Sequence, residues 1–155
     1  WYGRGPLETY PDCKEGNAIG CWEKNVEDFY FPYVLPQETG NHEDTRWAAF
    51  VTEAGNGICI ASDKEFSFGA LHYTQENLTQ ATHTNELHRT ENIQLSVDYA
   101  QHGLGSASWG AECLEKDKLY PEPFTFTWKI FGTEKESLAE RAEQYRRKKV
   151  RLPLF

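Results

Sequence analysis

The sequence of 155 residues contains no methionine, no long apolar run and no excess of positive charge. Its apolar segments are only a few residues long, whereas a membrane-spanning helix needs about 20 consecutive apolar residues. Acidic residues outnumber lysine and arginine by 24 to 16, which gives a formal net charge of −8. Nucleic-acid binding needs clustered cations that neutralise phosphates. We therefore expect neither a membrane nor a nucleic acid as partner.

Paired cysteine motifs are also missing. The four cysteines, at positions 13, 21, 59 and 113, show no CxxC pattern or other short spacing. Free, buried thiols are the plain interpretation of such a pattern, and they favour a reducing compartment, so we expect a cytoplasmic location. His83 and His88 are five residues apart and no HExxH motif occurs, so we expect no metal site in this chain and interpret His83 as a hydrogen-bonded core residue.

The first twelve residues alternate glycine and proline with bulky rings, as in Trp1-Tyr2-Gly3-Arg4-Gly5-Pro6. Glycine permits close backbone approach and proline fixes φ, so this composition is typical of a shaped loop inside a domain. Asp12 and Glu8 have the character of acceptors that fix such a loop. Because methionine is also absent, we expect Trp1 to be a cut end and the chain to be a piece of a longer protein.

Short segments of β-type composition dominate the first two thirds of the chain. They are rich in aromatic and β-branched residues, and Gly55-Asn56-Gly57 between two of them is a hairpin signal. A short helix is predicted near 75–81, where Thr74 can cap it, and a second over 137–149. The second helix has a sparse apolar stripe and a basic end, so we expect it to pack weakly or on a partner. Many short strands between turns indicate an all-β sandwich. The predicted strands are 25–34, 46–52, 57–61, 65–71, 92–98 and 124–130.

Five phrases occur in a recognisable order: 1–12, 33–41, 44–47, the stretch from Tyr73 to Leu87, and 101–110. Together they resemble the C-terminal domain of the large β-galactosidases of glycoside hydrolase family two, over roughly Trp1 to Ile130. The resemblance implies an antiparallel super-sandwich that is similar to the galactose mutarotases, of which this chain is about the second half. It places that half at 1–132 and leaves 133–155 as a helical tail.

The same resemblance implies retaining hydrolysis of terminal, non-reducing β-D-galactose. Retention needs two carboxyl groups about 5 Å apart. The family carries both glutamates, with magnesium and sodium ions, in a barrel that this chain lacks, so no catalytic residue and no cofactor is expected here. The expected partners are a galactoside substrate, the rest of the β-galactosidase chain or a large subunit, and further copies in a homo-oligomer.

Trp109 falls on the family position whose ring stacks against the sugar. A sugar's C–H face packs on an aromatic ring, and glycines in 103–110 let a loop reach outward. Gln101 and His102 lie near this loop and are weaker candidates for the same pocket, whereas Arg46 and Glu38 are interpreted as structural. Two other functions stay open: a stand-alone, non-catalytic carbohydrate-binding or interaction module, and, less favoured, a self-sufficient mutarotase-like enzyme.

Overall fold

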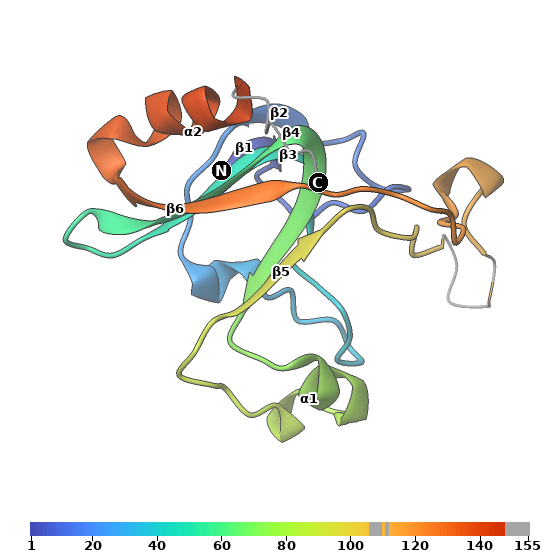
Figure 1. Cartoon of the computed structure of the whole chain (residues 1–155). Coiled ribbons are helices and arrows are strands. Elements are labelled where there is room, and N and C mark those ends of the chain that lie inside the picture. Colours follow the sequence, from blue (N-terminus) through green and yellow to red (C-terminus); the bar gives the residue numbers. More distant parts are fainter. Residues whose placement is uncertain (106–109, 111, 148–155) are drawn as a thin grey trace.

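The computed structural model describes residues 1–105, 110 and 112–147. Its described strands form one six-stranded antiparallel sheet in the order β2-β1-β3-β4-β5, with β6 also paired to β4 (Figure 1). The predicted all-β, antiparallel class is therefore confirmed. The strands are β1 (Tyr2–Gly5), β2 (Ala18–Cys21), β3 (His42–Val51), β4 (Asn56–Leu71), β5 (Gln94–Asp98) and β6 (Trp128–Glu134). The helices are α1 (Gln75–Gln80) and α2 (Leu138–Arg147), with 3-10 turns η1 (Val26–Phe29), η2 (Thr84–Glu86), η3 (Glu115–Asp117) and η4 (Lys135–Ser137).

The β3–β4 hairpin organises the sheet. Gly55 at its tip has φ +84°, which a side chain would strain, and a Cβ on Gly57 would lie only 1.9 Å from the carbonyl oxygen of Phe50. The predicted hairpin is confirmed. The strands predicted at 57–61 and 65–71 are, however, one continuous strand of 16 residues, because β3 pairs with β4 on both sides of the polar residues 63–65.

Two apolar clusters lie on the two faces of the sheet. The larger includes Trp1, Phe29 and Phe68, and the smaller includes Trp47 and Cys59. Helix α2 covers the smaller cluster: Ala142 is fully buried in it, and the rings of Phe131 and Tyr145 stack with centroids 4.0 Å apart. The sparse apolar stripe of this helix therefore packs on this chain's own sheet, with Ala142 as the buried residue of α2.

Three other local predictions are corrected. The segment 25–34 is not a strand: η1 is followed by irregular chain, since Phe29 is used as a core anchor and Tyr33 bonds to Glu8. The last strand begins at Trp128 and not at 124. The opening stretch, predicted as loop, contains β1, because Tyr2 to Gly5 pair along their whole length with β2.

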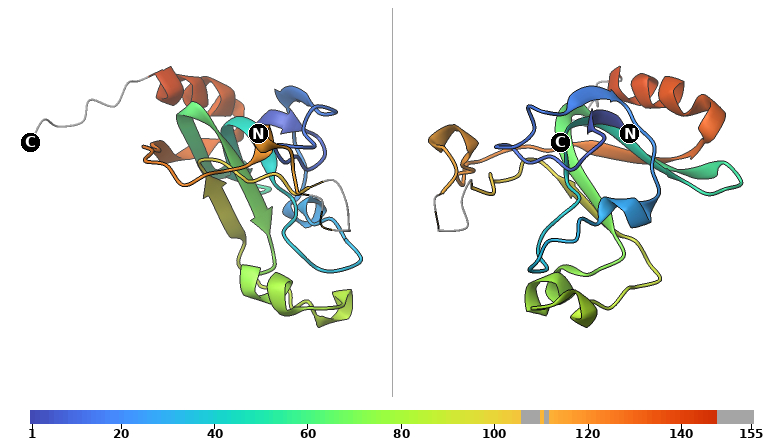
Figure 2. Two further views of the ribbon diagram at one scale, coloured as in Figure 1. Left: turned by 90° about the vertical axis from the view of Figure 1, so that its right-hand side faces the viewer. Right: turned by 180° about the vertical axis from the view of Figure 1, so that it is seen from behind.

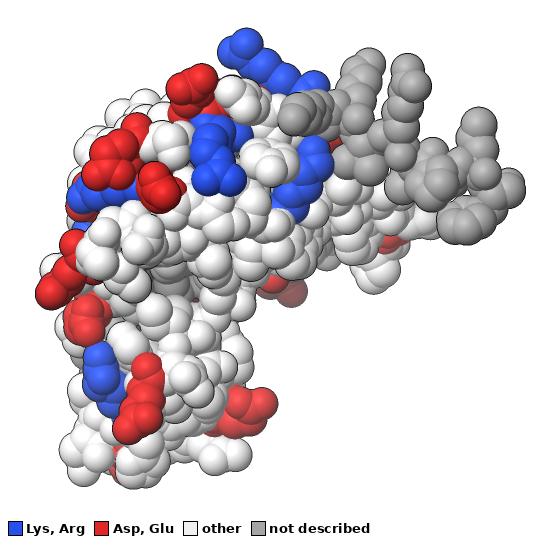
Figure 3. Space-filling view, turned by 60° about the vertical axis from the view of Figure 1, so that its left-hand side comes forward, with Lys and Arg blue, Asp and Glu red and all other residues white. Residues whose placement is uncertain are grey.

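The two helices lie at opposite ends of the sheet, with α1 far from α2 in every view (Figure 2). Thr74 caps α1 as predicted, since its side chain accepts a hydrogen bond from the Asn77 backbone N–H at 3.1 Å. Acidic and basic side chains are interspersed on the face shown in Figure 3. No helix within the described part of the chain has the length and apolarity to cross a membrane.

Candidate functional site

The predicted sugar-contacting residue, Trp109, lies outside the described residues. The structure does describe both flanks of its loop, 101–105 and 112–118, and we call these flanks the loop stem. The backbone N–H of Gly103 on one flank donates to the carbonyl oxygen of Asp117 on the other at 2.8 Å. The stem is therefore closed by a direct backbone bond, which fixes where the loop leaves the domain.

Asp12 holds the first flank from outside the loop. Its carboxylate accepts hydrogen bonds from the backbone N–H groups of Leu104 at 3.1 Å and Gly105 at 2.7 Å. Two donors on one carboxylate form a strong, directional pair of bonds. The prediction that Asp12 fixes a loop is confirmed, and its partner is the loop that carries Trp109.

Glycine is required at two positions of the stem. A Cβ on Gly103 would lie 2.9 Å from the Cβ of Cys113 and 3.1 Å from the Cβ of Asp117, so a larger residue would force the flanks apart. Gly105 has φ +87°, a conformation that L side chains rarely adopt. The stem is thus a close-packed turn, and only glycine fits both positions without displacement.

Gln101 and His102 both belong to this stem. Gln101 is partly buried and donates from Nε2 to the carboxylate of Asp98 at 2.9 Å. His102 is exposed, and its Nδ1 lies 2.7 Å from the carbonyl oxygen of Gly103 and 3.6 Å from the sulfur of Cys113. Their place beside the Trp109 loop agrees with the sequence prediction, while contact with a sugar stays a prediction.

The turn that carries Asp12 is itself rigidly attached to the sheet. Thr9 and Tyr10 are fully buried, and the Thr9 backbone N–H donates to the carbonyl oxygen of Asn41 at 2.7 Å. The side-chain amide of Asn41 returns a bond to the Thr9 carbonyl oxygen at 2.9 Å. Asp12 is therefore positioned by strand β3, which Asn41 immediately precedes, and it transmits that position to the loop stem.

The motif residues Glu8, Glu38 and Arg46 are structural, as predicted. Glu8 accepts from the backbone N–H of Gly40 at 2.7 Å and from the hydroxyl of Thr39 at 2.9 Å. Glu38 accepts from the amide of Gln75 at 2.9 Å. Arg46 donates to the carbonyl oxygen of Asp44 and to the carboxylate of Glu65, each at 2.5 Å.

Three partly or fully buried carboxyl groups have raised pKa values. Burial raises the pKa of Glu38, of Glu43 and of Asp98. Raised carboxyl pKa values are often found at functional sites, but each of these groups has a structural partner. Glu38 bonds to Gln75, Glu43 to the Asn41 amide at 3.1 Å, and Asp98 to Gln101. We therefore assign them to the framework, with Asp98 supporting the start of the loop stem.

The position of His83 differs from the sequence prediction, and the cysteines agree with theirs only in part. His83 is exposed and bonds to Glu86 at 3.1 Å, so its predicted core position is wrong; the turn η2 puts it on the surface. All four cysteines are free, but only Cys59 and Cys113 are buried. No group of three or more His, Cys, Asp or Glu side chains that could hold a metal ion occurs among residues 1–105, 110 and 112–147.

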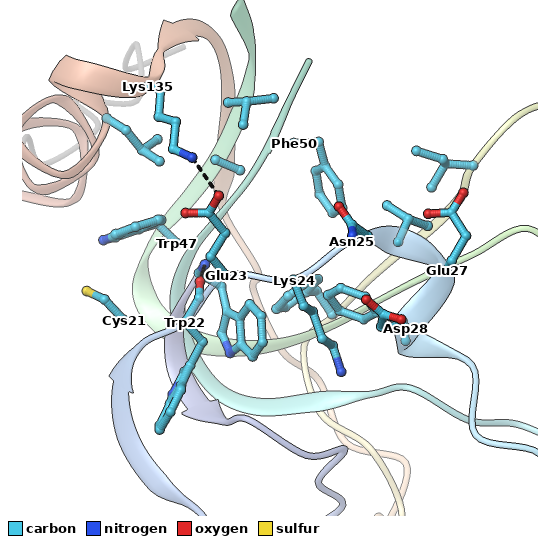
Figure 4. Close-up of a pocket in the computed structure, with 18 of the residues that line it drawn as sticks. Cys21, Trp22, Glu23, Lys24, Asn25, Glu27, Asp28, Trp47, Phe50 and Lys135 are labelled. Carbon is cyan, nitrogen blue, oxygen red and sulfur yellow. Dashed lines mark hydrogen bonds and ion pairs between the residues drawn. The ribbon is translucent and has the colours of Figure 1, made fainter. Parts of the chain in front are cut away.

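A separate groove of about 1090 Å³ lies away from the loop stem (Figure 4). One wall is the segment from Trp22 to Asp28, and the other includes Lys135 and the start of α2. Lys135 and Glu23 bridge the walls with an ion pair at 2.5 Å. Neither Gln101 nor His102 lines the groove. The end of β3 also lines the groove, so the groove is a feature of the sheet edge that no described residue of the loop stem reaches.

Comparison with known proteins decides the family. Residues 1–130 match the family model described as β-galactosidase small chain. The chain belongs to the β-galactosidase small-chain family. The resemblance seen in the sequence is thereby confirmed, and the match covers the whole sheet up to Ile130 in β6.

Individual relatives of this small-chain domain agree. The chain is 38% identical over 123 residues to β-galactosidase BgaC of Bifidobacterium adolescentis, covering 77% of this chain and 12% of that protein. It is 32% identical over 130 residues to a β-galactosidase of Staphylococcus xylosus, and the match covers 84% of this chain and 13% of that protein. It is 34% identical over 132 residues to a β-galactosidase of Kluyveromyces lactis, and the match covers 84% of this chain and 12% of that protein. The chain thus spans only about an eighth of the length of these relatives.

Proposed function

We propose that this chain is part of a retaining β-galactosidase, which hydrolyses terminal, non-reducing β-D-galactose residues. The small-chain family match over residues 1–130 carries the proposal. Because the chain spans 12–13% of its relatives, the catalytic glutamates and the magnesium and sodium sites are proposed to lie in sequence outside it. The rest of that enzyme, as one chain or as a large subunit, is the proposed partner, within a homo-oligomer.

Within that enzyme, this chain supplies one wall of the sugar pocket through Trp109. Support comes from the loop stem: Asp12 and the Gly103–Asp117 bond fix both flanks of the loop. A ring on a fixed stem offers a sugar a stacking surface with little ordering cost on binding. Gln101 and His102, at the base of the same loop, are secondary candidates for polar contacts with the sugar.

The test is the Trp109→Ala variant of the native protein that carries this sequence. The mass of the native protein is measured first. The activity of the native protein and of the variant on o-nitrophenyl β-D-galactoside is measured second. We expect a native mass well above 17.9 kDa and a KM raised about tenfold in the variant, because a lost stacking surface costs on the order of 1–3 kcal/mol. An unchanged KM would reject the sugar wall.

A native mass of 17.9 kDa, with galactose binding but no hydrolysis, would instead support the stand-alone carbohydrate-binding module. Calorimetric titration with galactose separates that outcome from a protein without any sugar site. Interconversion of the galactose anomers by a protein of this mass would support the self-sufficient, mutarotase-like enzyme.

A further inference from the structure

We propose that Asp44 is a positioning residue for the sugar site, although it lies on β3 and not in the loop stem. Its carboxylate holds the turn between β1 and β2. From that turn, Asp12 holds the loop that carries Trp109. This inference rests on the proposed function, which assigns the ring of Trp109 to the sugar pocket. A change at Asp44 therefore alters how well substrate binds, and not only how stable the domain is.

The backbone at Asp44 is strained. Among residues 1–105, 110 and 112–147, Asp44 is the single non-glycine residue with a positive φ, at +50°. The register of β3 against β4 also shifts on both sides of Thr45. Side chains disfavour this left-handed region, and aspartate and asparagine tolerate it best. Such a conformation persists only where surrounding contacts hold it, so the contacts of the Asp44 side chain explain its position.

Two cations bond to the Asp44 carboxylate. Oδ2 accepts from Nε of Arg4 at 2.6 Å, and Oδ1 accepts from Nζ of Lys14 at 2.8 Å. The side chains of Arg4, Lys14 and Asp44 are only 17%, 24% and 18% exposed, so water screens these bonds in part. Burial acts to raise the pKa of Asp44, but the bonds from both cations outweigh it and lower the pKa. The carboxylate therefore stays charged and keeps both partners at neutral pH.

Arg4 and Lys14 carry the position of Asp44 into the turn. The guanidinium of Arg4 donates from Nη1 to the carbonyl oxygens of Lys14 at 3.1 Å and of Asn17 at 3.0 Å. The N–H of Asn17 donates to the Lys14 carbonyl oxygen at 3.0 Å, which closes a turn over residues 14–17. Strand β1, the bulge in β3 and this turn are thus joined at one carboxylate.

The turn that contains Asp12 comes directly before this one. It is closed by the Cys13 N–H, which donates to the carbonyl oxygen of Tyr10 at 3.0 Å. One end is fixed because Tyr10 is fully buried. The other end is fixed because Asp44 binds the ammonium group of Lys14. Loss of the Asp44 charge releases the second end, so the carboxylate of Asp12 shifts relative to the loop stem.

The test is hydrolysis of o-nitrophenyl β-D-galactoside by the Asp44→Asn variant of the native protein. Asparagine tolerates the left-handed backbone, so the variant removes the charge and one acceptor but keeps the bulge. We expect KM to rise about three- to tenfold and kcat to change less than about twofold. An unchanged KM would overturn the proposal.

Two variants of Lys14 test the same link from the other side. Lys14→Met keeps a long, unbranched side chain but has no charge, so its KM should rise as in Asp44→Asn. Lys14→Arg keeps a cation, so its KM should return to within about twofold of the native value. Equal KM values for these two variants would show that the charge of Lys14 does not position the turn, contrary to the proposal.

Glu143→Gln is the matched control for a general loss of stability. The Glu143 carboxylate also lies beside two cations, Arg146 at 2.8 Å and Arg147 at 3.9 Å, but it belongs to α2. The midpoint of urea unfolding reports the stability of this variant and of Asp44→Asn. KM should rise only in Asp44→Asn. The same rise in both variants would reduce the role of Asp44 to stability alone and reject the proposal.

Trp109→Ala separates failure of this inference from failure of the proposed function. In that variant, adding Asp44→Asn should raise KM less than about twofold further, because residues that act through one another are not additive. Full additivity would reject the positioning role. A KM raised by Trp109→Ala but not by Asp44→Asn would reject the inference and leave the proposed function intact. A native mass of 17.9 kDa without hydrolysis would reject both.

Discussion

The carboxylate of Asp12 accepts a hydrogen bond from the backbone N–H of Gly105 at 2.7 Å, although the two residues are 93 positions apart in the sequence. This bond joins the turn between β1 and β2 to the loop that carries Trp109. Because the turn is fixed by the buried residues Thr9 and Tyr10, the loop stem takes its position from the sheet. The side chain of Asp12 therefore connects the framework to the proposed sugar site.

The first prediction concerns this connection. In Asp12→Asn an amide NH₂ replaces one of the two acceptor oxygens, so one of the two backbone N–H groups loses its partner. Loss of a hydrogen bond to a charged group costs about 1.5–3 kcal/mol. The loop stem can then shift away from the position that Asp12 gives it. We expect KM for o-nitrophenyl β-D-galactoside to rise about three- to tenfold, with a smaller change in kcat.

The matched control is Glu15→Gln, which removes an exposed carboxylate from the same turn. It should leave KM unchanged. If Asp12 acts through Trp109, adding Asp12→Asn to the Trp109→Ala variant should raise KM little further, since coupled residues are not additive. Fully additive effects would contradict a positioning role for Asp12.

The second prediction concerns the packing of the stem. Gly103→Ala places a methyl group 2.9 Å from the Cβ of Cys113, and such overpacking costs about 1–3 kcal/mol. Gly16→Ala is the control, because a Cβ there meets no atom within 4 Å. Urea unfolding should show a lower free energy of unfolding for the first variant and little or no loss for the second. Equal stability of the two variants would show that the flanks can separate without cost.

The third prediction is a pH dependence of stability. His42 is fully buried among aromatic rings, and this burial lowers the pKa of its imidazole to about 3 from an ordinary value of 6.5. Between these two values the unfolded chain binds a proton that the folded chain does not. The His42 contribution to the free energy of unfolding is therefore complete above pH 6.5 and falls by up to about 1.4 kcal/mol per pH unit as the pH decreases toward 3.

Urea unfolding between pH 4 and 7 measures this slope. His42→Asn keeps a donor for the Gly40 carbonyl oxygen, to which the imidazole Nδ1 bonds at 3.1 Å, but has no group that titrates in this range. We expect this variant to lose the His42 part of the slope, whereas His88→Asn, at an exposed residue, should retain it. The same slope in both variants would disprove the assignment.

The fourth prediction concerns α2. Ala142 is fully buried against the sheet, whereas Ala139 on the same helix is exposed. Ala142→Glu would bury a carboxylate without a partner, which costs several kcal/mol, so α2 should detach and the helical signal in circular dichroism should fall. Ala139→Glu should change neither the signal nor the midpoint of urea unfolding appreciably. A stable, helical Ala142→Glu variant would show that α2 does not depend on this contact.

Elements with a local signal were predictable. Thr74 caps α1 through a bond three residues away, and Gly55 closes the turn of residues 52–55 between β3 and β4, with its N–H donating to the Thr52 carbonyl oxygen at 2.9 Å. The alternation in 92–98 corresponds to β5, which begins at Gln94. Strands β1 and β2 were missed because each has only four residues, and glycine-rich β1 is held by pairing with its neighbours.

The candidate site was predictable only in part. Asp12 could be recognised as an acceptor, because aspartate after proline is typical of turns. Its partners Leu104 and Gly105 could not, because nothing in the sequence relates positions so far apart. The contact between His102 and Cys113 could not be predicted either, because it forms only when the fold brings the two flanks of the loop together.

The sequence by itself determined the family, the antiparallel β class and the elements that short-range bonds define. Each phrase is a short run of neighbouring residues, and each turn glycine or capping residue acts on backbone groups only a few positions away. Tertiary structure alone decided that α2 packs on the sheet and that Asp12 holds the Trp109 loop. These features depend on contacts between distant segments, and such contacts exist only when the folding of the whole sheet fixes the geometry of each segment.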